Sequence, residues 1–388
     1  MVNSRRTAAF AFMRWLATRE FPGGLVAGAD DRAFVQDLVY TAIRRLRALR
    51  FVLGKYVAKW PKGELEAFLY IGAAQLLYMD SVPDFAAVNE IVSAAGLCRN
   101  RSVSKVVNAV LRNIARGRDA IEGELAASPA ELRESFPSVL ARRWSARMGA
   151  DRAAALMKEL NVPAKTFLAR RDGSFAELER GRRVEDVPGY HEGEFIVQDR
   201  ATAVAVELVG VSPGEKVLDA CAAPGGKTVQ LLWRGADLTA CEVNAVRRRR
   251  LDENLARTRL KARVVGSLAE IPACDRFDAV LVDAPCSNTG VLRRRPDARW
   301  NFLEERLSGL VALQKSILDG ACPFVRPGGR LVYSTCSLEP EENSMQTADF
   351  LSRHPDFALA DERELLPSED GSDGAYAALL LRKGDAGA

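Results

Sequence analysis

The spacing of apolar residues changes partway along this chain, and that change constrains its fold more than any other feature. Before about residue 118, apolar side chains recur three or four positions apart, as at Phe34, Leu38 and Ala42. This period places them on one face of an α-helix. Farther on, short apolar runs at 216–219, 277–283 and 329–335 alternate with helical stretches, a pattern typical of a parallel α/β sheet. The sequence therefore predicts an all-α N-terminal bundle followed by a doubly wound α/β domain.

Helix breakers and changes of composition divide the chain into three predicted parts. Because 388 residues exceed what one hydrophobic core usually serves, more than one domain is expected. Residues 1–125 should form a bundle of roughly five to seven helices, with breaks at Pro22-Gly23-Gly24, Pro61 and Pro83. Residues 126–194 should form a helical linker and a small module of short strands and turns, and residues 195–388 should form the α/β domain.

The cysteines and the apolar runs limit where the protein works. The chain holds 7 cysteines, an odd number scattered through apolar stretches, which favours a reducing cytoplasm over a disulfide framework. No apolar run reaches the roughly 18 residues of a membrane span. Near the N-terminus, Arg14, Arg19 and Glu20 interrupt the apolar stretch, so an amphipathic helix is expected there rather than a secretion leader. The net charge of +4 does not by itself indicate a nucleic-acid partner.

A loop of small residues follows the first predicted strand of the α/β domain. The run Cys221-Ala222-Ala223-Pro224-Gly225-Gly226-Lys227-Thr228 leads into a predicted helix. Its glycines allow a ligand to approach the backbone, and a helix N-terminus favours an anionic group. Cys221 stands where a phosphate-binding P-loop has its first glycine. A carboxylate, such as that of a methionine moiety, is therefore the better match.

An acidic residue, Glu242, follows the next predicted strand. It lies about twenty residues past the glycines, a spacing that suits hydrogen bonds to a ribose diol. An acidic residue at a strand end is also often exposed and solvated. The predicted ribose contact of Glu242 therefore rests on its spacing from the glycine loop.

Two cysteines follow two further strands at equivalent positions. Cys286 comes after the strand 277–283, and Cys336 comes after the strand 329–335. The remaining Cys98, Cys241, Cys274 and Cys322 are expected to be buried small hydrophobes. Carboxyl ends of parallel strands share one edge of a sheet, where ligands bind. We therefore expect Cys286 and Cys336 to lie in one functional pocket.

Paired thiols at such a site suit chemistry at a pyrimidine. C5 of a pyrimidine attacks a methyl sulfonium only after a nucleophile has added to C6, and a thiolate is suited to that addition. Asp283 can contact the amino or ring-nitrogen edge of a cytosine and favour the electron shift. No C-x-x-C spacing exists, and His191 and His354 lie outside these loops, so neither a metal site nor a Ser-His-Asp hydrolase is expected.

Long motifs in this part of the chain resemble those of the RsmB/NOP family of RNA cytosine-C5 methyltransferases. They are FIVQD at 195–199, DACAAPGGKT at 219–228, DAPCSNTGVLRRRPDARW at 283–300 and YSTCSLEPEEN at 333–343. The resemblance implies a Rossmann-like class I methyltransferase domain that binds S-adenosyl-L-methionine. It also implies that Cys336 is the nucleophile and that Cys286 assists product release. The implied cofactor contacts are Cys221, Ala222, Ala223, Pro224, Gly225, Gly226, Lys227, Glu242 and Asp283.

Two positions depart from the family's pattern. Glu242 stands where an Asp is more frequent, and Ser267 stands where an Asp usually holds the adenine amine. A contact from Ser267 to the adenine is expected to be weaker or made through water.

The helical part is similar to the NusB-type RNA-binding domain of the RsmB branch. The matching stretches are YIGAAQLL at 70–77, VNEIV at 88–92 and VNAVLR at 107–112. The two halves together imply methyl transfer to C5 of a cytosine in 16S rRNA, or in an early small-subunit assembly intermediate. The same chemistry on tRNA or 23S rRNA is the first alternative. A non-catalytic RNA-binding assembly or antitermination factor is the second.

Basic residues gather at two places and suggest contacts with RNA. At the first place, a solvated charged face is the alternative. That first group is Arg44, Arg45, Arg47, Arg50, Arg99, Arg101, Lys105, Arg112, Arg116 and Arg118. The second group, Arg293, Arg294 and Arg295, flanks the loop of Cys286 and is expected to contact phosphates beside an extruded base. Residues 247–250 are expected to be solvated surface, and Trp300 is expected to pack in a core.

Overall fold

The computed structural model describes residues 3–79, 83–98, 100, 102–179 and 181–384. These residues pack as two units. Unit 1 comprises Met1–Val162 together with Arg295–Asn301, and unit 2 comprises Pro163–Arg294 together with Phe302–Ala388. The three parts predicted from the sequence are thus distributed over two packing units, with residues 126–162 in unit 1 and residues 163–194 in unit 2.

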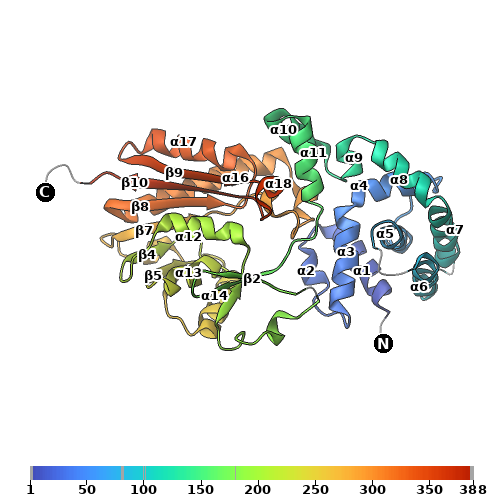
Figure 1. The fold of residues 1–388 in the computed structure, drawn as a ribbon, viewed down its shortest axis with the longest axis horizontal. Helices are drawn as coiled ribbons and strands as arrows, with labels where there is room; N and C mark the ends of the chain where they lie inside the picture. The colour runs from blue at the N-terminus through green and yellow to red at the C-terminus, as the bar shows by residue number, and fades with distance from the viewer. Residues whose placement is uncertain (1–2, 80–82, 99, 101, 180, 385–388) are drawn as a thin grey trace. The chain divides into compact units, whose positions relative to one another are not determined.

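Unit 1 consists of helices, as the apolar period predicts (Figure 1). Asn3 and Asp31 cap the first and third helices by accepting hydrogen bonds from backbone N–H groups of the first turn. The helices are α1 (Ser4–Thr18), α2 (Pro22–Leu25), α3 (Arg32–Arg44), α4 (Leu46–Gly54), α5 (Glu64–Tyr78), α6 (Asp84–Gly96), α7 (Ser102–Arg116), α8 (Arg118–Ala127), α9 (Ala130–Arg133), α10 (Ser138–Met148), α11 (Ala150–Glu159) and α15 (Ala298–Asn301).

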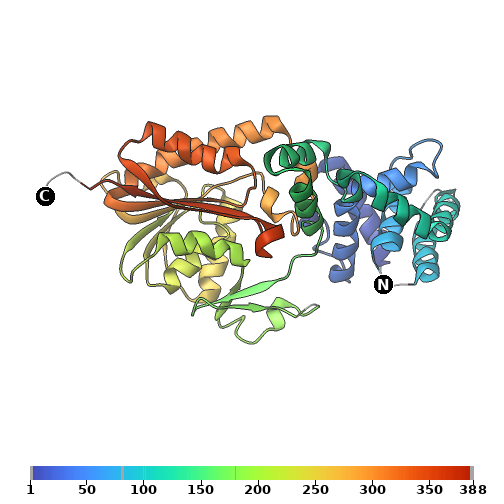
Figure 2. The same ribbon diagram turned by 45° about the horizontal axis from the view of Figure 1, so that its top comes forward.

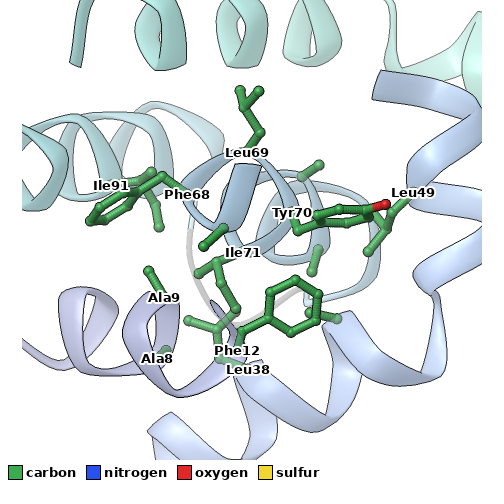
Figure 3. Close-up of a cluster of buried hydrophobic side chains, with 14 of the residues drawn as sticks. Ala8, Ala9, Phe12, Leu38, Leu49, Phe68, Leu69, Tyr70, Ile71 and Ile91 are labelled. Carbon is green, nitrogen blue, oxygen red and sulfur yellow. The ribbon is translucent and has the colours of Figure 1, made fainter. Parts of the chain in front are cut away.

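Helix α5 forms the centre of this unit. All residues from Ala67 to Leu77 are buried, and a helix that is apolar on every face requires neighbours on every side. Figure 3 shows side chains of other helices around it, among them Phe12, Leu38 and Ile91. Gly72 allows the closest approach, because a Cβ atom at this position would lie 2.4 Å from a methyl carbon of Leu111 on α7.

A short segment of the distant DAPC motif, residues 295–301, completes unit 1. The Arg299 side chain is fully buried, donates hydrogen bonds to Asn161 Oδ1 at 2.9 Å and Leu160 O at 3.2 Å, and lies 3.9 Å from the Phe136 ring centroid. Burial, together with nearby arginines, holds the Arg299 pKa well below its usual value. Trp300 donates from Nε1 to Ile43 O at 2.7 Å and packs against the core of unit 1, which confirms its predicted role.

Unit 2 begins with a small antiparallel sheet of three short strands. Its strands are β1 (Phe167–Arg170), β2 (Phe175–Glu177) and β3 (Phe195–Val197), in the order β2-β1-β3. Asp172 closes the turn between β1 and β2, because its carboxylate accepts hydrogen bonds from the backbone and the hydroxyl of Ser174. The strands and turns predicted for this stretch are therefore present.

A seven-stranded sheet with helices on both faces follows. The strand order is β6-β5-β4-β7-β8-β10-β9, with β4 to β8 parallel and β10 antiparallel to both of its neighbours. The elements are α12 (Ala203–Val209), β4 (Lys216–Asp219), α13 (Gly226–Trp233), β5 (Asp237–Cys241), α14 (Ala245–Thr258), β6 (Arg263–Val265), β7 (Phe277–Asp283), α16 (Glu304–Ala321), β8 (Val325–Thr335), α17 (Ser344–Arg353), β9 (Phe357–Leu365), α18 (Pro367–Asp370) and β10 (Ala375–Arg382).

Alternating side chains of the central strands supply the cores on the two faces. Leu218 and Val280 pack in the core that includes α16 and α17, whereas Val217 and Ala279 pack in the core that includes α12, α13 and α14. Figures 1 and 2 show α12 and α16 on opposite faces of the sheet. Burial on both faces explains why these strands occur in the sequence as continuous apolar runs.

The strand order changes direction at β4, which fixes where a ligand binds. From β4 the chain proceeds to β5 and β6 on one side and later to β7 and β8 on the other. In such sheets the crevice at the carboxyl ends of the strands, at the change of direction, receives the ligand. Within the part of the chain that the structure describes, no helix is long and apolar enough to cross a membrane.

Replacing Arg299 with Ala should destabilise unit 1 by about 3 kcal/mol or more, because buried carbonyl acceptors lose their donor. Urea unfolding followed by tryptophan fluorescence would measure this, since Trp15, Trp60, Trp144 and Trp300 all lie in unit 1. Arg116→Ala, at an exposed position on α7, is the matched control and should change the stability little. An Arg299→Ala variant as stable as the control would contradict the anchoring role.

Candidate active site

The glycine loop lies between β4 and α13, at the carboxyl edge of the sheet. Gly225 adopts a φ of 106°, a conformation that favours glycine, and a Cβ atom there would lie 2.8 Å from a methyl carbon of Leu251. The loop is held in place by Asn254, which donates to Pro224 O at 2.8 Å, and by Arg247, which donates to Ala223 O at 2.7 Å. Helix α13 begins at Gly226, so its free N–H groups face the loop.

Asp219, the last residue of β4, was not among the predicted site residues. Its side chain is buried, and Oδ2 accepts a hydrogen bond from Thr228 Oγ1 at 2.7 Å. Oδ1 is also buried and has no hydrogen-bond partner among the described residues. Burial raises the pKa of Asp219 to about 6, although the Thr228 hydrogen bond opposes this shift. A buried carboxylate oxygen without a donor is suited to a cationic or hydrogen-bond-donating group of a ligand.

The predicted ribose and adenine contacts lie on the neighbouring strands. Glu242 follows β5 and is buried, with Oε1 accepting from the backbone N–H of Asn244 at 2.9 Å and Oε2 lying 3.5 Å from Arg247 Nη2. Each carboxylate oxygen can accept a second hydrogen bond. Ser267 follows β6, and its Oγ accepts from the Ala269 N–H at 3.2 Å. Arg247 is exposed, as predicted, and it also contacts both Glu242 and the glycine loop.

Asp283 ends β7 and forms an ion pair with the lysine of the glycine loop. Asp283 Oδ2 accepts from Lys227 Nζ at 2.6 Å, and Oδ1 accepts from Ser334 Oγ at 2.9 Å. Burial lowers the pKa of Lys227, but the charges of Asp283 and Cys336 outweigh burial, so the pKa is raised. Lys227 is therefore a fixed cation between the glycine loop and the predicted nucleophile.

The two predicted catalytic thiols are in contact. Cys286 Sγ and Cys336 Sγ lie 3.3 Å apart, because β7 and β8 are adjacent parallel strands. The hydrogen bond to Cys336 and burial raise the pKa of the Cys286 thiol well above its usual value. Cys336 is partly exposed. The contact therefore favours a protonated Cys286 beside a Cys336 that is accessible to a substrate.

Asn288 connects the two thiol-bearing loops and was not predicted to do so. It adopts a left-handed conformation with a φ of 61°, which Asn tolerates better than most residues. Its Nδ2 donates to Cys286 O at 2.9 Å, and its Oδ1 accepts from Cys336 Sγ at 3.3 Å. The Asn288 amide thus touches the predicted nucleophile directly.

A small pocket, with a cavity volume of about 40 Å³, lies beside Cys336 within unit 2. Its wall includes Lys227, Cys336 and Tyr376, together with Asp199 and Asp373. The pocket places a partly exposed thiol next to a fixed cation at the carboxyl edge of the sheet.

The arginines beside the Cys286 loop form ion pairs with acidic residues of the protein. The prediction that they contact phosphates is wrong for Arg293, which is buried and lies 3.3 Å from Asp373 Oδ1. Arg294 binds Asp373 at 2.5 Å and Asp199 at 2.6 Å, so its guanidinium braces the pocket wall. Arg295 belongs to unit 1 and pairs with Asp297.

The basic residues of unit 1 also have internal roles in several cases. Arg44 is buried, Arg45 pairs with Glu134, and Arg47 donates to Phe136 O at 2.7 Å. Arg99 and Arg101 lie outside the described residues. The exposed basic residues on α7 form a charged face of this unit. They are Lys105, Arg112 and Arg116.

The other cysteines do not join the site as reactive thiols. Burial raises the pKa of Cys221 at the glycine loop. Cys98, Cys241 and Cys322 are buried as predicted, but Cys274 is exposed in a turn and the prediction for it is wrong. Among the described residues, no group of three or more His, Cys, Asp and Glu side chains is arranged to hold a metal ion.

Comparison with known proteins finds a family match for each half of the chain. Residues 206–381 match the family model described as 16S rRNA methyltransferase RsmB/F, and residues 2–116 match the NusB family. The chain is 33% identical over 396 residues to the ribosomal RNA small subunit methyltransferase B of Erwinia tasmaniensis, covering 92% of each chain. It is 32% identical over 397 residues to the protein of the same name from Vibrio cholerae, covering 91% of this chain and 90% of that one.

Solved structures share the fold. The crystal structure of the protein PH0851 superposes with a TM-score of 0.77 at 22% identity, covering 98% of each chain. A methyltransferase homologue from Pyrococcus horikoshii superposes with a TM-score of 0.58 at 22% identity, covering 65% of this chain and 97% of that one.

Fold, site and relatives define an S-adenosylmethionine-dependent RNA cytosine-C5 methyltransferase. The predicted fold class, enzyme class and methyl donor are therefore confirmed. More specifically, the chain belongs to the RsmB/F family of 16S rRNA methyltransferases, with a NusB-family domain at its N-terminal end.

The raised pKa of Asp219 predicts a pH-dependent affinity for S-adenosylmethionine. As the pH falls through about 6, Asp219 takes up a proton and loses the negative charge that we expect to attract the ammonium group of the methionine moiety. Below that pH, Kd should rise by up to about tenfold per pH unit, measured by calorimetry.

Asp219→Asn should bind more weakly at neutral pH and should lose this pH dependence. Asp237→Asn, an exposed position at the opposite end of β5, is the control and should behave as the wild type. An unchanged pH profile in Asp219→Asn would exclude Asp219 as the titrating group.

Proposed function

We propose that this chain transfers a methyl group to C5 of a cytosine in 16S rRNA through a covalent bond between Cys336 Sγ and C6 of the base. The contact between the two thiols, 3.3 Å apart beside a pocket, carries the proposal. The names of the full-length relatives, which are small-subunit rRNA methyltransferases, support this choice of substrate. A small-subunit assembly intermediate is the proposed form of that RNA.

The residues around the glycine loop fit S-adenosylmethionine. The buried and unpartnered oxygen of Asp219 and the close approach at Gly225 leave a polar cradle at the end of β4. When bound there, S-adenosylmethionine supplies an electrophilic methyl group. The proposed contacts are the loop from Cys221 to Lys227, Glu242 to the ribose, Ser267 near the adenine, and Asp283.

Cys336 and Cys286 divide the work on the base. The Cys336 thiolate adds its electron pair to C6, which makes C5 nucleophilic. After C5 has gained the methyl group, it loses its proton, the bond between C6 and sulfur breaks, and the electron pair returns to Cys336. Cys286, the polar group next to that sulfur, is assigned to accept the C5 proton, after its own proton has passed to solvent in the adduct, where Cys336 no longer carries a negative charge.

Asp283 and Lys227 supply the charges for this chemistry. Asp283 is the proposed contact to the cofactor and to the amino or ring-nitrogen edge of the cytosine. Because it holds Lys227 Nζ at 2.6 Å, it also fixes an ammonium group in the pocket wall. A cation there stabilises the negative charge that develops on the base when the thiolate adds.

The proposed setting is the cytoplasm, where a small ribosomal subunit is assembled. All 7 cysteines are unpaired thiols, which suits a reducing compartment.

Cys336→Ala should abolish methyl transfer, with a loss of at least about 1,000-fold in rate, because no other accessible thiol faces the pocket. Tritium transfer from labelled S-adenosylmethionine to unmodified 16S rRNA measures the rate. Cys274→Ala, which alters an exposed cysteine away from the site, is the control. Full activity of Cys336→Ala would exclude the covalent mechanism.

In the Cys286→Ala variant, Cys336 should still form its bond to the base, but the base should be released slowly. A covalent protein–RNA complex should accumulate and survive denaturing gel electrophoresis, while turnover falls by about 100-fold. The complex should be absent from the double variant that also lacks Cys336. Normal turnover without a trapped complex would remove Cys286 from the release step.

Bisulfite sequencing of total RNA from a deletion strain identifies the substrate. The proposal expects one 5-methylcytosine to disappear from 16S rRNA and to return when the wild-type gene, but not Cys336→Ala, is restored. Loss of a mark from tRNA or 23S rRNA instead would reassign the RNA. No lost mark, together with no binding of S-adenosylmethionine, would favour a non-catalytic assembly factor.

A further inference from the structure

The buried carboxylate of Glu342 lies close to the loops that carry the two thiols, and it was not among the predicted site residues. Glu342 lies in a short 3-10 helix after β8 and is fully buried. Its Oε1 accepts hydrogen bonds from the Ser287 N–H and from Gln314 Nε2, both at 2.9 Å. Its Oε2 accepts from Ser287 Oγ and Ser337 Oγ, both at 2.5 Å. Four donors therefore converge on one carboxylate.

These donors come from the segments that carry the thiols. Ser287 directly follows Cys286, and Ser337 directly follows Cys336. Gln314, on α16, also donates to Pro285 O at 2.9 Å, just before Cys286. The carboxylate of Glu342 thus joins the loop after β7, the loop after β8 and helix α16. A shift of either loop would break at least one of its hydrogen bonds.

The charge of Glu342 affects the Cys286 sulfur. Among the described residues no cation forms an ion pair with Glu342, so its charge is balanced only by hydrogen-bond donors. That charge contributes to the raised pKa of the Cys286 thiol, after the Cys336 hydrogen bond and burial. Lys227 lines the same pocket as Cys336, which contributes to the raised pKa of Lys227. A carboxylate near Cys286 opposes loss of the Cys286 proton, and an ammonium group lies in the pocket wall that also includes Cys336.

Other titratable groups face the same pair. Asp283 binds Lys227 and reduces the effect of its charge, and Tyr333 donates a hydrogen bond from its hydroxyl to Glu342 O at 2.6 Å. Burial, with the nearby Cys286 and Glu342, keeps the Tyr333 pKa well above its usual value, so this side chain stays neutral. Glu342 is a buried carboxylate that accepts a hydrogen bond from the backbone N–H of Ser287, the residue after Cys286.

We infer that Glu342 is a positioning residue for the methyl transfer: it fixes the spacing of the two thiols and keeps their shared proton on Cys286, so that Cys336 carries the negative charge. This inference rests on the proposed function. In the resulting pair, Cys286 Sγ–H donates to the Cys336 thiolate, whose proton has left to solvent, so the hydrogen bond from Cys336 Sγ to Asn288 Oδ1 is given up. Cys336 is thereby the sulfur that attacks.

Glu342→Gln tests the charge with little change in shape. We expect kcat for RNA methylation to fall by about 10- to 100-fold, with KM for S-adenosylmethionine unchanged. Glu342→Asp, which keeps the charge, should recover part of kcat. Glu305→Gln makes the same substitution at an exposed position on α16 and is the matched control.

Thiol labelling provides a readout that a purely structural role would not change in this way. Brief treatment of the full chain with iodoacetamide at neutral pH, followed by peptide mass spectrometry, gives the ratio of Cys336 to Cys286 alkylation. Cys336 should be labelled first in the wild type and in Glu342→Asp. In Glu342→Gln this ratio should fall by about fivefold or more, because the proton is no longer kept on Cys286.

The outcomes separate this inference from the proposed function. An unchanged kcat and labelling ratio in Glu342→Gln, in a wild-type background that methylates RNA, would overturn the role of Glu342 alone. A wild type that never methylates RNA would overturn the proposed function, and the labelling ratio would still test Glu342. If Glu342→Gln does not fold, Ser337→Ala, which removes one donor from the same carboxylate, should lower the labelling ratio in the same direction, and no change would count against the inference.

Discussion

The parallel pairing of β7 with β8 is the constraint on which the site depends. In this register Asp283 lies opposite Ser334, so the chain leaves both strands at one edge of the sheet. Cys286 and Cys336 follow within three residues of those positions, and their sulfurs meet because neighbouring parallel strands are only about 5 Å apart. The pairing of β4 with β7 then brings the glycine loop, with Lys227, to the same edge. Local sequence and sheet geometry together bring the three loops into one site.

Fixed charges around this edge are arranged in pairs that hold the loops in place. Lys227 with Asp283 ties the glycine loop to β7. Arg294 with Asp199 and Asp373 ties the Cys286 loop to the segments before α12 and before β10. Such partly buried pairs contribute less to stability than their number suggests, because desolvation offsets much of the attraction. Their consequence here is geometric, since they limit the movement of the pocket wall.

The sequence predicted the strands, the glycine loop and the thiol pair because each depends on local pattern. A continuous apolar run such as 277–283 indicates a buried strand, and parallel strands place their carboxyl ends together. Contacts between distant residues escaped prediction. Arg293 looked like a phosphate ligand because Asp373, its partner, is 80 residues away. Asp219 looked like an ordinary strand residue, and its unpartnered oxygen is visible only once Thr228 is placed.

Because the segment 295–301 packs with unit 1, one cut in the chain cannot separate the two units completely. It leaves the α/β unit directly after Arg294, supplies Arg299 and Trp300 to the helical unit, and returns at Phe302. A fragment that starts at residue 163 would retain this segment without its surroundings, exposing a tryptophan and an arginine that are built for a protein interior. A fragment that ends at residue 162 would lack part of its own core. An enzyme that acquired this helical domain by recombination would therefore also need a segment equivalent to residues 295–301 to complete the core of that domain.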